Sequence, residues 1–318
     1  MRPFLVLGLV AVLCSFAAPA FADDVSADVL QAESLSTDGK FAEALQLLNH
    51  YLSEHPQDAR ALVDRGDIYQ TQGKTRESIA DYSAALAVNP EYAYALASRG
   101  DSYVQIEDYP HAIADASKAL ELRPNYGYAL RVRGMARLDT HDVTGAQTDL
   151  HQAIKVDSNS AYSYADACRA DREAKQPDLA LKECATALQI EPENYVALFW
   201  QGRLQIDASN WSDAESTYTK VLKIEDNDDA ASNYWRAVAR YEMHHGDDAL
   251  SDINTYMKAY PDDGDGFYLR AQIDQLRGDL VAAKKDANSA LEHYGIDDDT
   301  AGMTRARALL DQLNGAKS

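Results

Sequence analysis

The chain has 318 residues, of which 46% are apolar and 25% are charged, an ordinary composition for a soluble globular protein. Its 51 acidic residues outnumber its 30 basic residues and give a net charge of -21. Nucleic acid and anionic lipid attract cationic surfaces, so this charge balance argues against both as partners.

The first 22 residues have the pattern of a cleavable secretory signal. Arg2 precedes the apolar run FLVLGLVAVLCSFAA, and Ala20 and Ala22 place small residues at positions -3 and -1 of a cleavage site. The run is too short for a comfortable membrane anchor, so no membrane insertion is expected after cleavage. The sequence therefore predicts an exported protein, periplasmic or secreted, whose mature chain starts near Asp23.

The rest of the chain repeats with a period of 34 residues. Six rows align without gaps from Val25, and one inserted residue, Asp229, precedes two further rows. Within 23–297, the eight predicted repeats are 25–58, 59–92, 93–126, 127–160, 161–194, 195–228, 230–263 and 264–297. Every row has a small residue at its positions 8 and 20, and Pro, Ser, Asp or Gly at position 32.

This pattern predicts one pair of antiparallel helices in each row. Small side chains at positions 8 and 20 allow the two helices to approach closely, and a turn falls near position 15. Proline at position 32 ends the second helix because it cannot continue the backbone hydrogen bonding. A lone pair of short helices cannot bury its apolar faces, so the pairs must stack on one another.

Residues 298–318 follow the last row and contain apolar residues at helical spacing between Thr300 and Leu313. We expect a C-terminal capping helix that covers the open end of the stack.

The stretch GDIYQTQGKTRESIADYSAALAVNP, from Gly66 to Pro90, has Gly at position 8, Tyr at 11, Gly at 15, Tyr at 24, Ala at 27 and Pro at 32. In this it resembles the tetratricopeptide repeat (TPR) family. The resemblance implies an all-α fold, a right-handed superhelical solenoid of about eight helix-turn-helix repeats plus the capping helix. The chain departs from the family pattern at position 4, which never holds Trp, and at position 11 of rows four to six, which lacks Tyr.

Arginine at position 7 and aspartate at position 23 occur together in the same five rows. These two positions lie at nearly equal distances from the turn, so their side chains should face each other and form charge-assisted hydrogen bonds. The predicted ion pairs are Arg65 with Asp81, Arg99 with Asp115, Arg133 with Asp149, Arg236 with Asp252 and Arg270 with Asp286. Two of these arginines begin Arg-Gly-Asp strings, and their position inside a helix argues against a displayed adhesion ligand.

Two cysteines of the predicted mature chain, Cys168 and Cys184, occupy positions 8 and 24 of row five. They lie on either side of the turn, and in an oxidising compartment they are well placed for a disulfide. The alternative is a pair of small buried thiols.

Sequence motifs of catalysis are missing from the chain. There is no Gly-x-Ser-x-Gly, no phosphate loop, no Cys-x-x-Cys and no His-Glu-x-x-His. The strings MHHGDD and PDDGDG fall at turns and lack the ligand spacing of a zinc site or an EF-hand. We therefore expect no enzyme activity, no cofactor and no metal.

The family resemblance also implies a concave surface lined by positions 2, 5, 9, 12 and 13 of the first helix of each repeat. In rows three to six these positions hold Tyr94, Tyr128, Arg131, Tyr162, Arg169, Arg172, Phe199 and Arg203. Arginines beside aromatic residues in an acidic molecule favour a groove for an extended peptide that bears carboxylates. The alternative is that these arginines neutralise carboxylates of neighbouring rows.

Together these features predict a non-catalytic protein- or peptide-binding scaffold, or adaptor, of the cell envelope. Two alternatives stay open. One is a self-associating structural protein, for which a homo-oligomer is possible, and the other is an enzyme with its site on the helical frame.

Overall fold

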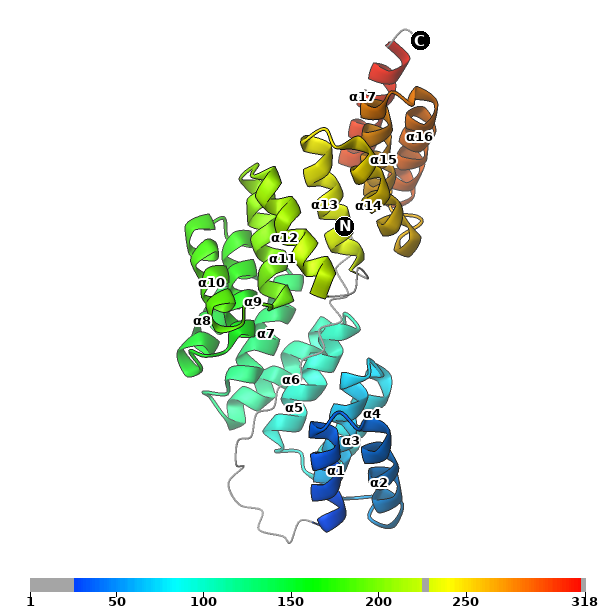
Figure 1. The fold of residues 1–318 in the computed structure, drawn as a ribbon. Coiled ribbons are helices and arrows are strands. Elements are labelled where there is room, and N and C mark those ends of the chain that lie inside the picture. Colours follow the sequence, from blue (N-terminus) through cyan, green and yellow to red (C-terminus); the bar gives the residue numbers. More distant parts are fainter. Residues whose placement is uncertain (1–25, 225–228, 316–318) are drawn as a thin grey trace. The chain divides into compact units, whose positions relative to one another are not determined.

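The computed structural model describes residues 26–224 and 229–315. Within these residues the chain is entirely helical, and successive helices pack as antiparallel pairs (Figure 1). The predicted all-α class with paired helices is therefore confirmed. The predicted signal sequence, residues 1–22, lies outside the described residues. None of the described helices has the length and apolar character needed to cross a membrane.

The chain divides into two compact units, which are described separately below. The N-terminal unit, with described residues 26–159, contains α1 (Ala27–Thr37), α2 (Phe41–Glu54), α3 (Ala59–Thr71), α4 (Thr75–Val88), α5 (Ala93–Gln105), α6 (Tyr109–Leu122), α7 (Gly127–Asp139) and α8 (Val143–Val156). The C-terminal unit, with described residues 160–224 and 229–315, contains α9 (Ala161–Glu173), α10 (Pro177–Ile190), α11 (Tyr195–Asp207), α12 (Trp211–Ile224), α13 (Ala230–Glu242), α14 (Gly246–Ala259), α15 (Gly264–Arg277), α16 (Leu280–Ile296) and α17 (Thr300–Gly315).

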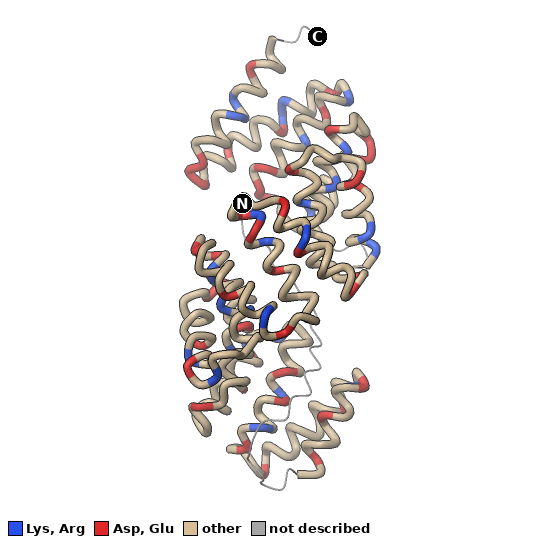
Figure 2. Tube along the Cα trace, turned by 90° about the vertical axis from the view of Figure 1, so that its left-hand side faces the viewer, with Lys and Arg blue, Asp and Glu red and all other residues tan. Residues whose placement is uncertain are grey.

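Each of the eight pairs consists of a first helix, helix A, and a second, helix B. From α3 onward, helix A starts on the first residue of its 34-residue row. Aspartate caps helices of both kinds, because its carboxylate accepts hydrogen bonds from the free backbone N–H groups and its charge complements the helix dipole. Asp58, Asp108, Asp142, Asp229, Asp263 and Asp279 act in this way. Part of the acidic excess, which is spread along the helices of both units (Figure 2), therefore has a structural use.

The turn between helix A and helix B has the same backbone conformation in all eight pairs. Its residue at position 15 has a positive φ, which favours glycine. Gly39, Gly73 and Gly278 meet this requirement with φ of 74°, 69° and 83°. Five other rows place Glu107, His141, Lys175, Ser209 and His244 there, at φ between 58° and 65°. The turn geometry is thus imposed by the packing of the helix pair even where the residue disfavours it.

Small residues at positions 8 and 20 are buried in every row, where helix A contacts helix B. At Gly66 a Cβ atom would lie 2.8 Å from Cε1 of Tyr82, and at Gly202 it would lie 2.6 Å from Cζ of Tyr218. Both tyrosines, at position 24 of their rows, are fully buried. The small residue therefore makes room for a large side chain of helix B, as close packing of the core requires.

Helix α17 packs against the last helix pair of the C-terminal unit. Leu309 and Leu313 lie with Ala271, Ala283 and Ala287 in one apolar cluster. Leu313 is fully buried, so α17 covers the apolar face that α15 and α16 present at the end of their unit.

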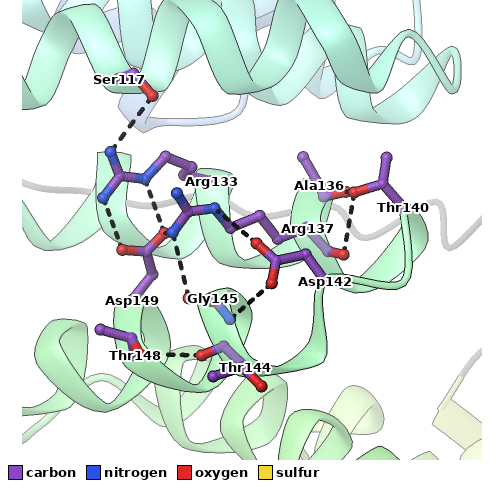
Figure 3. A network of polar contacts seen from close by, with 10 residues as sticks. All are labelled: Ser117, Arg133, Ala136, Arg137, Thr140, Asp142, Thr144, Gly145, Thr148 and Asp149. Atoms are coloured by element: carbon purple, nitrogen blue, oxygen red, sulfur yellow. Dashed lines mark hydrogen bonds and ion pairs between the residues drawn. The ribbon is translucent and has the colours of Figure 1, made fainter.

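The arginines at position 7 form a repeated seam of hydrogen bonds. In α7, Arg133 donates from Nε and Nη2 to the Asp149 carboxylate at 2.8 and 2.7 Å (Figure 3). Its Nη1 donates to Ser117 of the preceding helix B at 3.3 Å. Arg137, one turn later, donates to the same carboxylate at 2.7 Å. Each such fork joins one helix A to two successive helices B.

The other four rows repeat this arrangement. Two hydrogen bonds, between 2.5 and 3.0 Å long, join Arg65 to Asp81, Arg99 to Asp115, Arg236 to Asp252 and Arg270 to Asp286. The remaining guanidinium nitrogen donates to Asn49, Ser83, Thr219 or Asn254 of the preceding helix B. Both Arg-Gly-Asp strings lie within helices, α3 and α5, with their arginines bound in this seam.

Candidate peptide-binding face of the C-terminal unit

The residues predicted for a peptide groove are divided between the two units. Tyr94 on α5 and Tyr128 and Arg131 on α7 belong to the N-terminal unit. The C-terminal unit holds Tyr162, Arg169 and Arg172 on α9, and Phe199 and Arg203 on α11. The surroundings of the two groups differ in their chemistry.

In the N-terminal unit the predicted tyrosines are bound to carboxylates of the preceding repeat. The Tyr94 hydroxyl donates to Asp67 at 2.9 Å, and the Tyr128 hydroxyl donates to Asp101 at 3.2 Å. Their rings lie 6.4 Å apart. Arg131 is only 7% exposed and lies over the Tyr128 ring at 5.6 Å. These side chains form an internal ladder of tyrosine and aspartate.

Burial controls the ionisation of this ladder. It raises the pKa of Asp67 to about 6, although hydrogen bonds from Tyr82 and Tyr94 oppose the shift. Burial also raises the pKa of Asp101, against the lowering effect of Arg131. The Tyr82 hydroxyl donates to the second oxygen of Asp67 at 2.6 Å. Both oxygens of Asp67 thus accept hydrogen bonds from neutral groups.

In the C-terminal unit, two of the predicted arginines lie over a tryptophan of the next repeat. The guanidinium carbons of Arg169 and Arg172 are 5.3 and 6.0 Å from the ring centre of Trp200 on α11. Arg169 donates to Glu173 at 3.0 Å. Arg172 forms a two-pronged contact with Asp207, at 2.6 and 2.9 Å. Because the Asp207 side chain is 46% exposed, solvent screens this pair substantially.

Arg203 lies over the tryptophan of the following repeat. Its guanidinium carbon is 3.5 Å from the ring centre of Trp235 on α13, the distance of direct stacking. Its Nε is buried and has no hydrogen-bond partner among the described residues. Burial, and then the positive charge of Arg172, lower the pKa of Arg203 to about 10. Its surroundings thus disfavour its charge, unlike those of the arginines in the seam.

The other two predicted residues of this unit, Phe199 and Tyr162, differ in their burial. Phe199 is 8% exposed and makes edge contacts with Trp200 at 5.2 Å and with Tyr218 at 5.9 Å. It therefore positions Trp200 from within the core. Tyr162 on α9 is partly exposed.

The tryptophans themselves were missed by the sequence prediction. Trp200 and Trp235 each occupy position 6 of their rows, one row after the arginines at position 9 that they meet. This recurrence of Arg at position 9 followed by Trp at position 6 is the signal that could have revealed them. We call the surface made by Arg169, Arg172, Trp200, Arg203 and Trp235 the arginine–tryptophan face.

A disulfide joins α9 to α10 directly beside this face. Cys168 and Cys184 are bonded, with their Cα atoms 5.3 Å apart. They occupy the positions at which Gly66 meets Tyr82 in row two. Trp200 packs against the apolar cluster that contains both cysteines. The disulfide thus replaces a Gly–Tyr contact in this repeat and lies beneath the platform of Arg169 and Arg172.

Two models of the family described as tetratricopeptide repeat match the chain, over residues 63–127 and 171–240. No curated protein is significantly similar to it in sequence. Among solved structures, a chain of the APC/C hetero-tetramer Cut9-Hcn1 is similar with a TM-score of 0.74 and 14% identity. That similarity covers 90% of this chain and 55% of the other, so this chain spans about half the length of that relative.

A second similar structure is that of pilF from Pseudomonas aeruginosa, with a TM-score of 0.52 and 17% identity over 62% of this chain and 90% of the other. At these identities the likeness to both structures concerns the fold. The two family matches, one in each unit, together with the eight successive helix pairs identify tetratricopeptide repeats in this chain.

Proposed function

We propose that this protein is a non-catalytic scaffold of the cell envelope, and that it holds an extended, carboxylate-bearing segment of a partner protein on its arginine–tryptophan face. The family is one of protein–protein interaction scaffolds, which supports the general role. The observation that carries the specific proposal is the gathering of three arginines on two tryptophans in a chain whose net charge is -21.

The chemistry of this face suits an acidic peptide. Guanidinium groups bind carboxylates through paired hydrogen bonds, and aromatic rings provide flat apolar contacts between the charged groups. Helices α9, α11 and α13 supply these side chains from successive repeats, so an extended peptide can contact them in turn. Arg172 already binds a carboxylate, that of Asp207, in the geometry that a peptide side chain would adopt.

Neutralisation of neighbouring carboxylates, the alternative use of these arginines, accounts for part of the face. It explains the contacts of Arg172 with Asp207 and of Arg169 with Glu173. It does not explain Arg203, for which no hydrogen bond or ion pair is found among the described residues. A carboxylate from a partner would supply the missing charge.

Affinity capture from an envelope extract tests the proposal. We expect the wild-type protein to enrich specific partners that an Arg169→Glu/Arg172→Glu variant loses. The matched control is Lys285→Glu/Arg307→Glu, which changes the net charge equally at two exposed residues of the same unit and should keep the partners. Far-UV circular dichroism checks that both variants remain helical. Retention of the same partners by the Arg169/Arg172 variant would contradict the proposed face.

The envelope location rests on the N-terminal sequence and agrees with the disulfide, because disulfides persist in oxidising compartments. Cell fractionation with mass spectrometry of the purified protein tests it. We expect the protein in the periplasmic or secreted fraction, with a mass that corresponds to a chain starting near Asp23. An unprocessed chain in the cytosol would contradict this part of the proposal.

A further inference from the structure

Arg203 and Trp235 stack on each other, and each has a buried N–H group without a hydrogen-bond acceptor among the described residues. Nε of Arg203 and Nε1 of Trp235 both lack a partner among the described residues. The Trp235 side chain is 8% exposed, while Arg203 remains partly exposed. Buried donors are nearly always bonded in native proteins, so two unmet donors in one stacked pair need an explanation.

No described group accepts a hydrogen bond from Nε of Arg203. The charged side chains that act most strongly on Arg203 are Arg172, which repels it, and Asp207, whose two oxygens accept hydrogen bonds from Arg172. Tyr218 is fully buried beside the same cluster, and its hydroxyl donates to the carbonyl oxygen of Phe199 at 3.5 Å. Tyr234 meets Trp235 edge-on, with ring centres 5.0 Å apart. The described chain thus surrounds Arg203 with a second cation, an engaged carboxylate and aromatic rings.

Other arginines of the unit show what Arg203 lacks. Arg236 binds both oxygens of Asp252, and Arg240 binds Glu215 and Asp252, each at 2.7 to 2.8 Å. Arg240 lies on α13, two repeats after Arg172 on α9, and two of its guanidinium nitrogens are paired with carboxylates. Among the partly buried arginines in the described residues of this unit, Arg203 is thus the one without an ion pair.

We infer that the Arg203–Trp235 pair is a subsite that binds a single carboxylate of the partner segment. The inference rests on the proposed function and adds which residue makes the central contact. A carboxylate supplies the counter-charge that is missing beside the desolvated guanidinium, and its oxygens accept hydrogen bonds from N–H groups. The Trp235 ring holds the guanidinium plane in place, so less side-chain freedom is lost on binding. The carboxylate comes from a Glu or Asp side chain or from the C-terminus of the partner.

Fluorescence anisotropy with three short rhodamine-labelled peptides tests the subsite and separates these two sources. The first peptide alternates Glu with Ala and ends in an amide, the second has Gln for every Glu, and the third is the Gln peptide with a free C-terminal carboxylate. We expect wild-type protein to bind the first or the third peptide more tightly than the second. Preference for the first assigns the subsite to an acidic side chain, and preference for the third assigns it to a chain terminus.

The decisive variant is Arg203→Met, which keeps a long side chain against Trp235 but removes the charge. We expect it to weaken binding of the preferred peptide by about tenfold, the loss of one well-formed charged contact. The matched control Arg307→Met removes an exposed arginine of the same unit and should bind as the wild type does. We also expect the Tm of Arg203→Met to equal or exceed that of the wild type, because a desolvated charge is removed. An arginine that serves only the fold would instead lower the Tm when replaced.

Two outcomes overturn the inference in distinguishable ways. If Arg172→Gln weakens peptide binding but Arg203→Met does not, the subsite is rejected and the proposed function stands. If wild-type protein binds all three peptides equally or none of them, an acidic segment is not the ligand of this face, and both proposals fall.

Discussion

The guanidinium of Arg65 and the carboxylate of Asp81 are joined by two parallel hydrogen bonds of 2.7 Å across the pair α3–α4. The third nitrogen of Arg65 donates to Asn49 on α2 at 2.8 Å. One side chain therefore links helix A and helix B of one repeat to helix B of the repeat before it. The same relationship in four other rows makes it a structural element of the repeat.

Removing Arg65 should destabilise the N-terminal unit. The Asp81 side chain is only 9% exposed, so Arg65→Ala leaves a buried carboxylate without its partner. We expect a loss of about 3 kcal/mol in the free energy of unfolding. Arg76→Ala, at an exposed position of α4, should change it by less than about 0.5 kcal/mol. Urea unfolding followed by far-UV circular dichroism measures both. Equal stability of the two variants would mean that the seam contributes nothing.

Replacing both cysteines, in Cys168→Ala/Cys184→Ala, should destabilise the C-terminal unit. The disulfide closes a loop between residues 16 apart, which corresponds to about 3 kcal/mol in the chain-entropy model. All three tryptophans of the chain, Trp200, Trp211 and Trp235, lie in this unit, so their fluorescence reports its unfolding alone. We expect the unfolding midpoint to fall, and the wild type under a reducing agent to behave like the variant. A midpoint insensitive to both changes would show that the bond does not stabilise the unit.

The partly buried Asp67 should make the stability of the N-terminal unit depend on pH. Its pKa rises from 3.8 to about 6 on folding, so between these values the folded state binds more protons than the unfolded state. The free energy of unfolding therefore decreases as pH rises from 3.8 to about 6. Above that range the ionisation of Asp67 lowers it by a constant amount. Asp67→Asn mimics the protonated form and should raise the Tm relative to the wild type.

This gain should be largest above pH 6 and shrink as pH falls toward 3.8. The difference between the variant and the wild type isolates Asp67 from neighbouring acids such as Asp64, whose pKa burial also raises. Thermal unfolding over this pH range provides the measurement. A difference in Tm that stays constant with pH would contradict the raised pKa.

The turn at position 15 offers a test of backbone strain. Lys175 has φ of 59°, in the left-handed region that costs a non-glycine residue about 1 kcal/mol. Lys175→Gly should therefore raise the free energy of unfolding of the C-terminal unit by about 1 kcal/mol. The control Lys175→Ala shortens the side chain but keeps the Cβ atom, so it should not stabilise the unit. Conversely, Gly73→Ala should lower the stability of the N-terminal unit. Tryptophan fluorescence follows the first two variants and circular dichroism the third. Equal effects of Gly and Ala at 175 would rule out strain at this turn.

The contacts within one helix pair could be predicted from the sequence. The helices are antiparallel and joined by a short turn, so residues at equal distances from the turn must meet. For this reason the period of 34 residues indicated the approach of Arg65 to Asp81 and of Cys168 to Cys184. The small residues at positions 8 and 20 indicated the close contact between the two helices in the same way.

Only the tertiary structure decided which side chains meet across neighbouring repeats. Row spacing does not determine how one helix pair is rotated and shifted against the next, and long side chains choose among several rotamers once that packing is set. Thus Tyr94 and Tyr128, predicted to bind a peptide, donate hydrogen bonds to Asp67 and Asp101 of the preceding repeat. Arg169 and Arg203 share position 9 of their rows, yet Arg169 is paired with Glu173, whereas Arg203 stacks on Trp235 and its Nε has no partner among the described residues. The sequence by itself determined the repeat and its internal seam, and packing between repeats determined which arginine lacks a counter-charge.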